Sequence, residues 1–536
     1  MDIGRAALRR LWLPAAVAAP AAFLALFFAY PLAAIVARGL TQGGSLSVPR
    51  SALVGEETLR ILWFTTWQAA LSTALTLAAG LPLAWVVGRF DFRGRSLVLA
   101  GVLVPFVLPT LVVAAAFSSL LPDRLDHSVW AILLAHAFFN VAVVVRVVGG
   151  YWAELGSAIP DAAAVLGAGR LRRLREVTLP LLAPALAAAA SLTFLFCFTS
   201  FGVILVLGGP RAATLETEIY NQAARLFDLR TAAALSLLQL TAVAAIVLVT
   251  GRLEGRLVGR QRASRPGALR RPAGKQWVAV GAVLVLSVAA LGLPVASLVV
   301  RSLSTADGIG FDYYRALGRE TSVLLVTPLQ AALNSLLFAA AATALALVVG
   351  GLLAVALARR RPSWLDGLVL LPLGASAVML GFGFVIAFDE PPLDLRASVV
   401  LVPIVQALVA APFVVRILAP ALRAVEARLR DAAAVLGASP HRVWREIDLP
   451  LALRAAGVAA GFAFAVALGE FGATVFVAQA DRPTLPVAIF RFLGRPGVQN
   501  QGVAAVLAVV LALLTIAAAV VSERGGVRRS VRPSAL

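Results

Sequence analysis

The sequence predicts an all-α polytopic membrane protein of about twelve transmembrane helices, arranged as two parallel six-helix repeats. Three observations predict this fold class. Of the 536 residues, 60% are hydrophobic and 14% charged, with a mean hydropathy of +0.91, whereas soluble domains are about 45–50% apolar and about 25% charged. The apolar residues form long runs, and the two halves of the chain repeat one another. The composition excludes a soluble enzyme, a disordered chain and a collagen-like chain.

Twelve runs are long enough to cross a bilayer, which takes about 20 mostly apolar residues per helix. In the first half the predicted spans are 11–36, 61–88, 96–121, 129–148, 181–208 and 231–250. In the second half they are 277–300, 329–358, 368–388, 398–418, 451–478 and 502–521. The first run is longer than the core of a cleavable signal peptide, about 7–15 residues. We therefore expect it to remain as an uncleaved helix.

The net charge of +20 is interpreted as a topology signal. Lys275 is the only lysine, and 33 of the 47 basic residues lie in segments that share a side with the N-terminus. Because basic residues accumulate on the cytoplasmic side, both termini are predicted to be cytoplasmic in a multi-pass protein of the cell inner membrane. A high positive charge can indicate binding to nucleic acid. Here the basic residues lie in segments next to the membrane, so we expect them to contact membrane lipids and expect no nucleic-acid partner.

An internal repeat with an offset of 270 residues organises the chain. The octapeptide Asp-Ala-Ala-Ala-Val-Leu-Gly-Ala occurs at 161–168 and again at 431–438. Each half has an even number of spans, so both halves face the same way and form a parallel repeat. The predicted domains are a first half at 1–251, a basic cytoplasmic linker at 252–276 and a second half at 277–536. The linker is rich in Arg, Gly and Pro, which is typical of a flexible segment.

The repeated segment predicts a short helix that docks a partner on the cytoplasmic side. An acidic residue stands at the positive end of the helix, small alanines allow close approach, and a glycine permits a tight turn. A proline follows in the first turn of the next span, where proline is tolerated. The alternative is an amphipathic helix lying on the lipid surface. The predicted docking residues are Asp161, Ala162, Ala163, Gly167, Pro180, Asp431, Ala432, Ala433, Gly437 and Pro450.

The spacing of these residues resembles the EAA motif, Glu-Ala-Ala-x₃-Gly-x₉-Ile-x-Leu-Pro, of permease subunits of binding-protein-dependent ABC importers. Asp161 and Asp431 stand in place of the glutamate, and Val177 in place of the isoleucine. The resemblance implies the type I ABC importer permease fold and coupling of both loops to an ATPase. It also implies two copies of an ABC ATPase subunit and a periplasmic or lipid-anchored substrate-binding protein. ATP and Mg would be bound by the ATPase, and no cofactor by this chain.

The resemblance extends over nearly the whole chain, as a fused permease whose two halves replace two subunits. The stretches 132–140, 196–202 and 207–220 are most similar to the thiamine type. Iron(III) permeases share the pattern around Phe201 and 214–220. The resemblance therefore implies import of thiamine by alternating access, with iron(III) or another small solute as the alternative.

Features of an enzyme are absent from the sequence. The only Gly-Lys pair, Gly274–Lys275, is followed by Gln276, so there is no phosphate-binding loop. The single Cys197 and the three unrelated histidines at 127, 136 and 441 form no recognisable metal or catalytic pattern. We expect a transport subunit that is not an enzyme. An ion-coupled secondary transporter with two parallel halves and a membrane enzyme are the rival classes.

Polar residues inside spans are the candidates for the substrate path, because they are costly in a bilayer. Glu470 is either a polar element that favours a cation such as thiamine, or a structural hydrogen-bonding residue. Phe201 and Phe471 form an apolar gate or simply pack. The segments 216–220 and 481–485 are either outer loops facing a binding protein or solvated loops. The path candidates are Asn140, Ser200, Phe201, Gln406, Glu470 and Phe471, and Gln239 and Asn334 are further polar residues that line the path or bond between helices.

Overall fold

The computed structural model describes eleven segments: 17–42, 45–46, 53–122, 124–155, 158–209, 212–258, 269–305, 307–359, 375–389, 393–424 and 427–527. They form two compact units. Unit 1 contains the described parts of 1–49, 219–237 and 310–536, and unit 2 those of 50–218 and 238–309. The start of span 11–36, the start of span 368–388, much of the linker and both termini lie outside the described residues.

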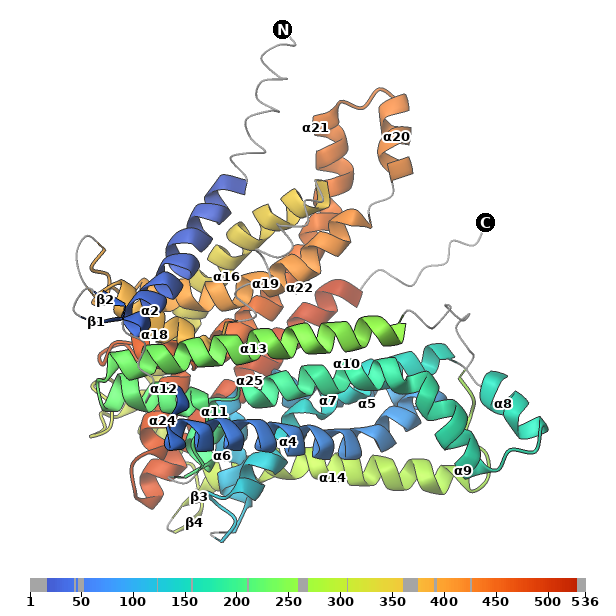
Figure 1. The fold of residues 1–536 in the computed structure, drawn as a ribbon, viewed down its shortest axis with the longest axis horizontal. Helices are drawn as coiled ribbons and strands as arrows, with labels where there is room; N and C mark the ends of the chain where they lie inside the picture. Colours follow the sequence, from blue (N-terminus) through green and yellow to red (C-terminus); the bar gives the residue numbers. More distant parts are fainter. Residues whose placement is uncertain are drawn as a thin grey trace. The chain divides into compact units, whose positions relative to one another are not determined.

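Unit 2 is built around three long helices from the first sequence half. Its helix α7 packs against both α4 and α10 (Figure 1). The elements are α4 (Glu56–Arg89), α5 (Arg95–Val107), α6 (Thr110–Leu120), α7 (Val129–Leu155), α8 (Ala158–Val165), α9 (Arg170–Arg173), η2 (Leu174–Thr178), α10 (Leu179–Phe198), α11 (Gly202–Leu207), α14 (Gln276–Leu303), β3 (Ser304–Thr305) and β4 (Gly308–Ile309).

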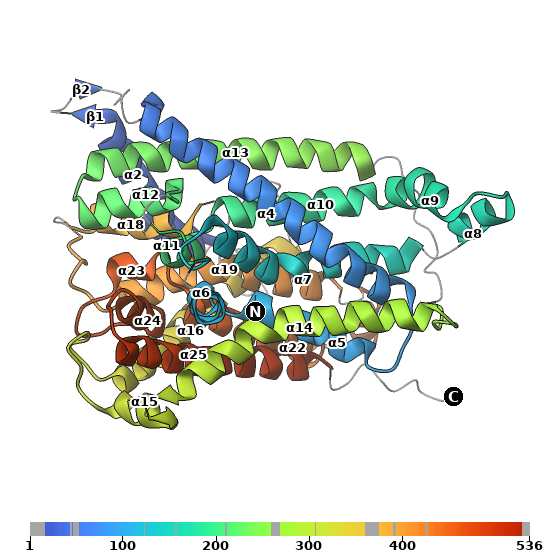
Figure 2. The same cartoon turned by 90° about the horizontal axis from the view of Figure 1, so that it is seen from below.

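Unit 1 is built in the same way from the second half, with α19 packed against both α16 and α22 (Figure 2). The elements are η1 (Ala25–Ala29), α2 (Tyr30–Leu40), β1 (Thr41–Gln42), β2 (Ser45–Leu46), η3 (Asn221–Arg225), α15 (Asp312–Arg315), η4 (Ala316–Gly318), α16 (Pro328–Arg359), α18 (Ala377–Ala387), α19 (Leu401–Arg423), α20 (Ala427–Val435), α21 (Pro440–Val443), η5 (Trp444–Asp448), α22 (Leu449–Gly469), α23 (Thr474–Val477), α24 (Leu485–Leu493) and α25 (Val498–Val527). Helices α12 (Leu215–Tyr220) and α13 (Leu229–Val258) cross the boundary between the units.

The strands are minor features. β1 pairs antiparallel with β2, and β3 with β4, each as a two-residue ribbon that directly follows a long helix. The all-α class predicted from the sequence is therefore confirmed.

Each unit includes the first long helix of the other sequence half. Helix α14, which begins the second half, packs on α4 and α6, and Ser297 on α14 donates a hydrogen bond to the Ala116 carbonyl at 3.2 Å. Helix α2, from the first half, packs on α18. There a Cβ added to Gly383 would lie 3.1 Å from a side-chain atom of Ile35, so a larger residue would crowd this close approach. The compact units thus do not coincide with the sequence repeat.

Ten helices of the described residues are long and apolar enough to span a membrane, and a bent pair makes up to eleven. The prediction was twelve. The predicted span 96–121 is the bent pair α5 and α6, whose axes differ by 97°. The bend falls at Leu108 and Pro109, because the residue before a proline is biased toward the extended conformation that Leu108 adopts. Of the predicted span 368–388 the structure describes the short helix α18.

The close packing of the long helices repeats at the 270-residue offset. A Cβ added to Gly80 on α4 would lie 2.8 Å from Val144 Cβ on α7, and one added to Gly350 on α16 would lie 2.9 Å from Val414 Cβ on α19. These distances are far below a normal contact, so only glycine fits. The duplication therefore preserves three-dimensional packing as well as sequence.

Candidate functional site

The two predicted docking loops have the same backbone structure. In the first, α8 ends at Val165, Gly167 in the turn that follows has a φ of +82°, and Ala168 donates its N–H to the Ala163 carbonyl at 3.0 Å. In the second, α20 ends at Val435, Gly437 in the following turn has a φ of +78°, and the equivalent hydrogen bond is 2.9 Å. This is the Schellman helix end, whose left-handed residue is usually glycine. No atom of the described residues lies within 4 Å of a Cβ added at either glycine, so it is the positive φ that favours glycine there.

Exposed aliphatic side chains lie at the tip of each loop. Val165 and Leu166 are 88% and 87% exposed, and Val435 and Leu436 are each 87% exposed. A pair of fully exposed large aliphatic residues on a rigid turn is costly in water, and such groups mark interaction surfaces. The alanine-rich face beside each pair leaves room for a partner to approach.

The segment after each turn leads directly into a long helix. Arg172 donates to Glu176 at 2.8 Å, and Arg442 donates to Glu446 at 2.9 Å, again at the 270-residue offset. The glutamate of each pair lies in a π-helical turn, Glu176 in η2 and Glu446 in η5. The next helix has proline as its second residue, Pro180 in α10 and Pro450 in α22. Proline has no N–H to contribute and is tolerated there.

An acid–guanidinium pair fixes each docking helix, but the two pairs differ. Both oxygens of Asp161 on α8 accept hydrogen bonds from Arg270, which belongs to the segment joining the two halves. In the second loop, Arg430 on α20 donates to Asp448 in η5 at 2.9 Å. No described side chain forms an ion pair with Asp431, the counterpart of Asp161, and its carboxylate is exposed.

A buried hydrogen-bond network brings two of the path candidates together. His136 on α7 contacts the Ser72 hydroxyl through Nδ1 at 3.0 Å and the Ser200 hydroxyl through Nε2 at 2.9 Å. Asn140 donates to the His136 carbonyl at 3.0 Å and to Cys197 Sγ at 3.5 Å. Sequence reasoning missed Ser72 and His136. His136 lies one turn before Asn140 on the same helix face, which is a signal that could have predicted it, whereas Ser72 lies on α4 and has no such signal.

The predicted run 451–478 places Glu470 inside a continuous span. In the structure the span is broken at this residue. Helix α22 ends at Gly469, and α23 begins at Thr474. The Glu470 carboxylate accepts the backbone N–H groups of Ala473 at 2.8 Å and Thr474 at 2.9 Å, as well as the Thr474 hydroxyl. Its oxygens are thus used to start α23, which supports the structural interpretation. The predicted span 181–208 is broken at the equivalent place, between Phe198 and Gly202.

The remaining path candidates are buried and separate. Phe201 and Phe471 are buried, and Phe471 packs on Phe490 with ring centroids 5.3 Å apart. Gln406 is buried on α19, and its Oε1 has no hydrogen-bond partner among the described residues. Asn334 on α16 is half-buried and donates to the carbonyl of Pro483, in the loop before α24, at 3.5 Å.

The expectation of an accessible outer loop at 216–220 is wrong. These residues are mainly helix α12, and the fully buried Glu216 accepts a hydrogen bond from Gln239 at 2.9 Å. The Thr65 hydroxyl accepts the N–H of Leu215 at 3.1 Å, and the Ser335 hydroxyl accepts that of Leu485. Hydroxyls on α4 and α16 therefore hold the starts of α12 and α24 inside the protein. The second predicted outer loop, 481–485, is buried only in part, because Asp481 and Arg482 are exposed.

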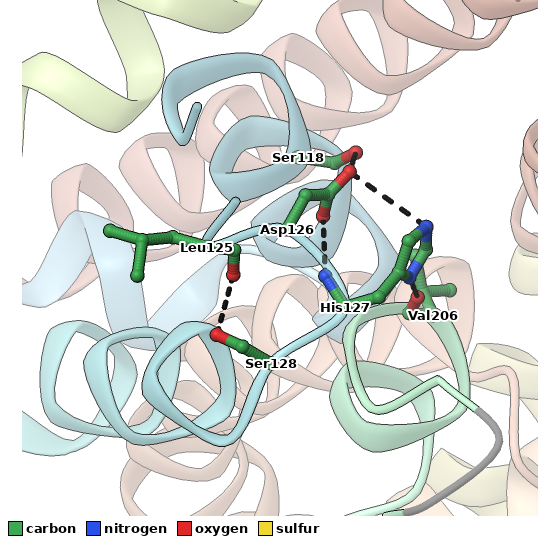
Figure 3. Close-up of polar contacts among 6 residues, drawn as sticks. All are labelled: Ser118, Leu125, Asp126, His127, Ser128 and Val206. Atoms are coloured by element: carbon green, nitrogen blue, oxygen red, sulfur yellow. Dashed lines mark hydrogen bonds and ion pairs between the residues drawn. The ribbon is translucent and has the colours of Figure 1, made fainter. Parts of the chain in front are cut away.

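A polar loop joins α6 to α7 at the end of α7 remote from α8 (Figure 3). Asp126 accepts hydrogen bonds from the Ser118 hydroxyl at 3.1 Å and from the His127 backbone N–H at 3.0 Å. The His127 ring contacts the Val206 carbonyl at 3.1 Å, and the residue has a φ of +54°. These contacts give the loop a defined shape although the His127 side chain is exposed.

Comparison with known proteins gives matches over most of the chain. The family model "Binding-protein-dependent transport system inner membrane component" matches twice, at residues 80–263 and 346–524. The thiamine transport system permease protein of Brucella abortus (strain 2308) is 30% identical over 94% of this chain and 95% of its own length. The equivalent protein of Escherichia coli (strain K12) is 26% identical, over 85% and 87% respectively. A probable ABC transporter permease protein of Sinorhizobium fredii (strain NBRC 101917 / NGR234) is 26% identical, over 95% and 96%.

Proposed function

We propose a transport function from one premise: the chain belongs to the family of binding-protein-dependent transport system inner membrane components. It is a multi-pass inner-membrane permease of the ABC importer type, and the family predicted from the two Asp-Ala-Ala motifs is confirmed. Permeases of this type associate with an ATPase and a substrate-binding protein. The proposals below concern the substrate, the partner surfaces and the orientation.

Thiamine is the substrate that we propose. Two of the relatives, matched over 95% and 87% of their length, are named thiamine transport system permease proteins, and the stretches 132–140 and 207–220 led to the same type from the sequence alone. His136, Asn140 and the buried Glu216 lie in these stretches. The single observation that carries the transport proposal is the pair of docking loops with equal backbones and exposed aliphatic tips.

The two docking loops are proposed to receive two copies of an ABC ATPase subunit, which binds ATP and Mg and carries out hydrolysis. The exposed pairs Val165–Leu166 and Val435–Leu436 supply the apolar contact. Because of the positive-inside bias, both loops and both termini are proposed to lie in the cytoplasm. Helix α7 has 27 residues, about 40 Å at 1.5 Å per residue. Its remote loop at 124–128 is therefore proposed to face the binding protein, as are Asp481 and Arg482.

The test uses cells without their own thiamine uptake that produce this chain with its ATPase and binding protein. Leu166→Asp combined with Leu436→Asp is expected to abolish ATPase co-purification and uptake of labelled thiamine, because a carboxylate replaces the apolar contact. Leu226→Asp is the matched control, since Leu226 is an exposed leucine of a loop outside the docking segments. Uptake by the double variant equal to that of the unaltered chain would contradict the docking proposal. Uptake of iron(III) but not thiamine by the unaltered chain would contradict the proposed substrate.

A further inference from the structure

Backbone hydrogen bonds hold Arg270 in place independently of its side chain. Its N–H donates to the Arg89 carbonyl at 3.1 Å, and its carbonyl accepts the Asp91 N–H at 2.9 Å. Together these form a parallel bridge to Phe90, whose buried ring packs edge-on against Trp85 at 5.1 Å. The linker residues at 269–270 are thus fixed to the end of α4.

From this position the Arg270 side chain reaches the first docking helix. Its two terminal nitrogens contact the two oxygens of Asp161, the paired geometry that makes arginine–carboxylate contacts strong. Arg89 interacts electrostatically with Arg270, Asp161 and Arg173. Two guanidinium groups, those of Arg270 and Arg89, therefore act on the Asp161 carboxylate, which is neutralised within the chain.

The second docking loop has no such arrangement. Among the described residues, no arginine from another segment forms an ion pair with Asp431, the counterpart of Asp161. The tether of α20 comes instead from Arg430 and Asp448 inside the loop, and these residues have Pro160 and Thr178 as first-half counterparts. Asp431 keeps an exposed carboxylate with no ion pair to any described side chain.

We propose that the two docking surfaces are chemically different, because the linker forms part of the first one. The first surface consists of the α8 turn together with Arg270 and presents guanidinium groups. The second consists of the α20 turn alone and presents the Asp431 carboxylate. An ATPase subunit that offers the same basic group to both loops gains a charge-assisted contact only at Asp431. This inference rests on the proposed docking of an ATPase at both loops.

The experiment measures the affinity of the purified ATPase subunit for the full chain in lipid nanodiscs. In the unaltered chain, Asp431→Asn is expected to weaken binding about tenfold, as for a lost hydrogen bond to a charged group, whereas Asp161→Asn changes it less than about twofold. Arg270→Gln frees the Asp161 carboxylate. This variant is expected to bind the ATPase about two- to fivefold more tightly, as for a half-exposed ion pair. In the Arg270→Gln chain, adding Asp161→Asn is then expected to weaken binding.

Two controls separate this effect from general damage. Arg430→Gln removes the contact between Arg430 and Asp448 in the second loop. In that variant, Asp161→Asn is still expected to have only a small effect on ATPase binding. Arg270→Lys keeps a positive charge and is expected to behave like the unaltered chain. Equal losses for Asp161→Asn and Asp431→Asn, with and without Arg270, would overturn the inference while leaving docking intact. Full ATPase binding by the Leu166→Asp, Leu436→Asp chain would instead overturn the proposed function, and this inference with it.

Discussion

The two docking loops have nearly identical backbones and different polar contacts. Gly167 and Gly437 differ in φ by only a few degrees, and the same two aliphatic residues are exposed beside each. Yet the first helix is tethered by a residue 109 positions away in the chain and the second by one 18 positions away. Backbone geometry and apolar contact persisted after duplication, while the polar residues diverged. If the loops dock a partner as proposed, the shared backbone and apolar residues would support docking, and the different polar residues would make the two surfaces unequal.

The broken spans show the same divergence at one pair of equivalent positions. Ser200 uses its hydroxyl to contact His136, whereas Glu470 uses its carboxylate to bind the first N–H groups of α23. Both arrangements hold a break in a helix that the sequence predicts as continuous. Only the second would leave several buried donors unsatisfied if the side chain were removed.

The largest expected effect follows from this difference. Glu470→Ala leaves two backbone donors and the Thr474 hydroxyl without an acceptor, at about 1–3 kcal/mol each, so we expect a large loss of thermal stability. Ser200→Ala removes one hydrogen bond, worth about 1 kcal/mol. The melting temperatures of the two variants in the same detergent provide the measurement. A larger loss for Ser200→Ala would mean that the two breaks are not held as described.

A smaller and symmetric effect is expected where the packing repeats. Gly80→Val and Gly350→Val each place atoms within 3 Å of the facing helix, and overpacking of this kind costs about 1–3 kcal/mol. Both variants should lower the melting temperature by similar amounts. Gly101→Val is the control, because nothing lies within 4 Å of a Cβ there. If only one of the two variants is destabilised, the packing of the two halves is not equivalent.

At the docking turns the effect is local. Gly167→Val and Gly437→Val force a β-branched residue to a positive φ, a strain of about 1–3 kcal/mol that the exposed turn can relieve by changing shape. We expect weaker ATPase co-purification with little change in melting temperature. Gly169→Val is the matched control, because Gly169 has a φ of −63° and open space around it. Unchanged co-purification would show that the turn geometry is not required for docking.

The smallest effect concerns the starts of α13 and α25. Asp228 accepts hydrogen bonds from the backbone and hydroxyl of Thr231, which hold its pKa below the ordinary value of 3.8. A lowered pKa contributes stability above pH 3.8 that is lost as the pH falls through the folded-state value. Asp228→Asn should therefore reduce stability slightly at neutral pH and remove this acid dependence. The counterpart of Asp228 is Val498, so Val498→Asn should show no such pH dependence in melting temperature.

Much of the fold followed from the sequence because long apolar runs and a fixed offset are local, additive signals. Runs such as 329–358 and 502–521 match α16 and α25 closely, and the two Asp-Ala-Ala turns were predicted with their glycines. The breaks at Ser200 and Glu470 were not predicted, because hydropathy averages over a window and does not register a carboxylate bound to backbone N–H groups. The bend between α5 and α6 was missed although Pro109 signals it.

The sequence by itself determined the membrane class, the duplication and the position of both docking turns. Each depends on residue type and spacing along one stretch of chain. Only the tertiary structure decided that α14 packs in the unit of the first half, that His136 joins Ser72 to Ser200, and that Arg270 neutralises Asp161. These are contacts between residues 64 to 181 positions apart. No local pattern encodes such contacts, because the partner of a polar side chain is chosen by how the helices pack.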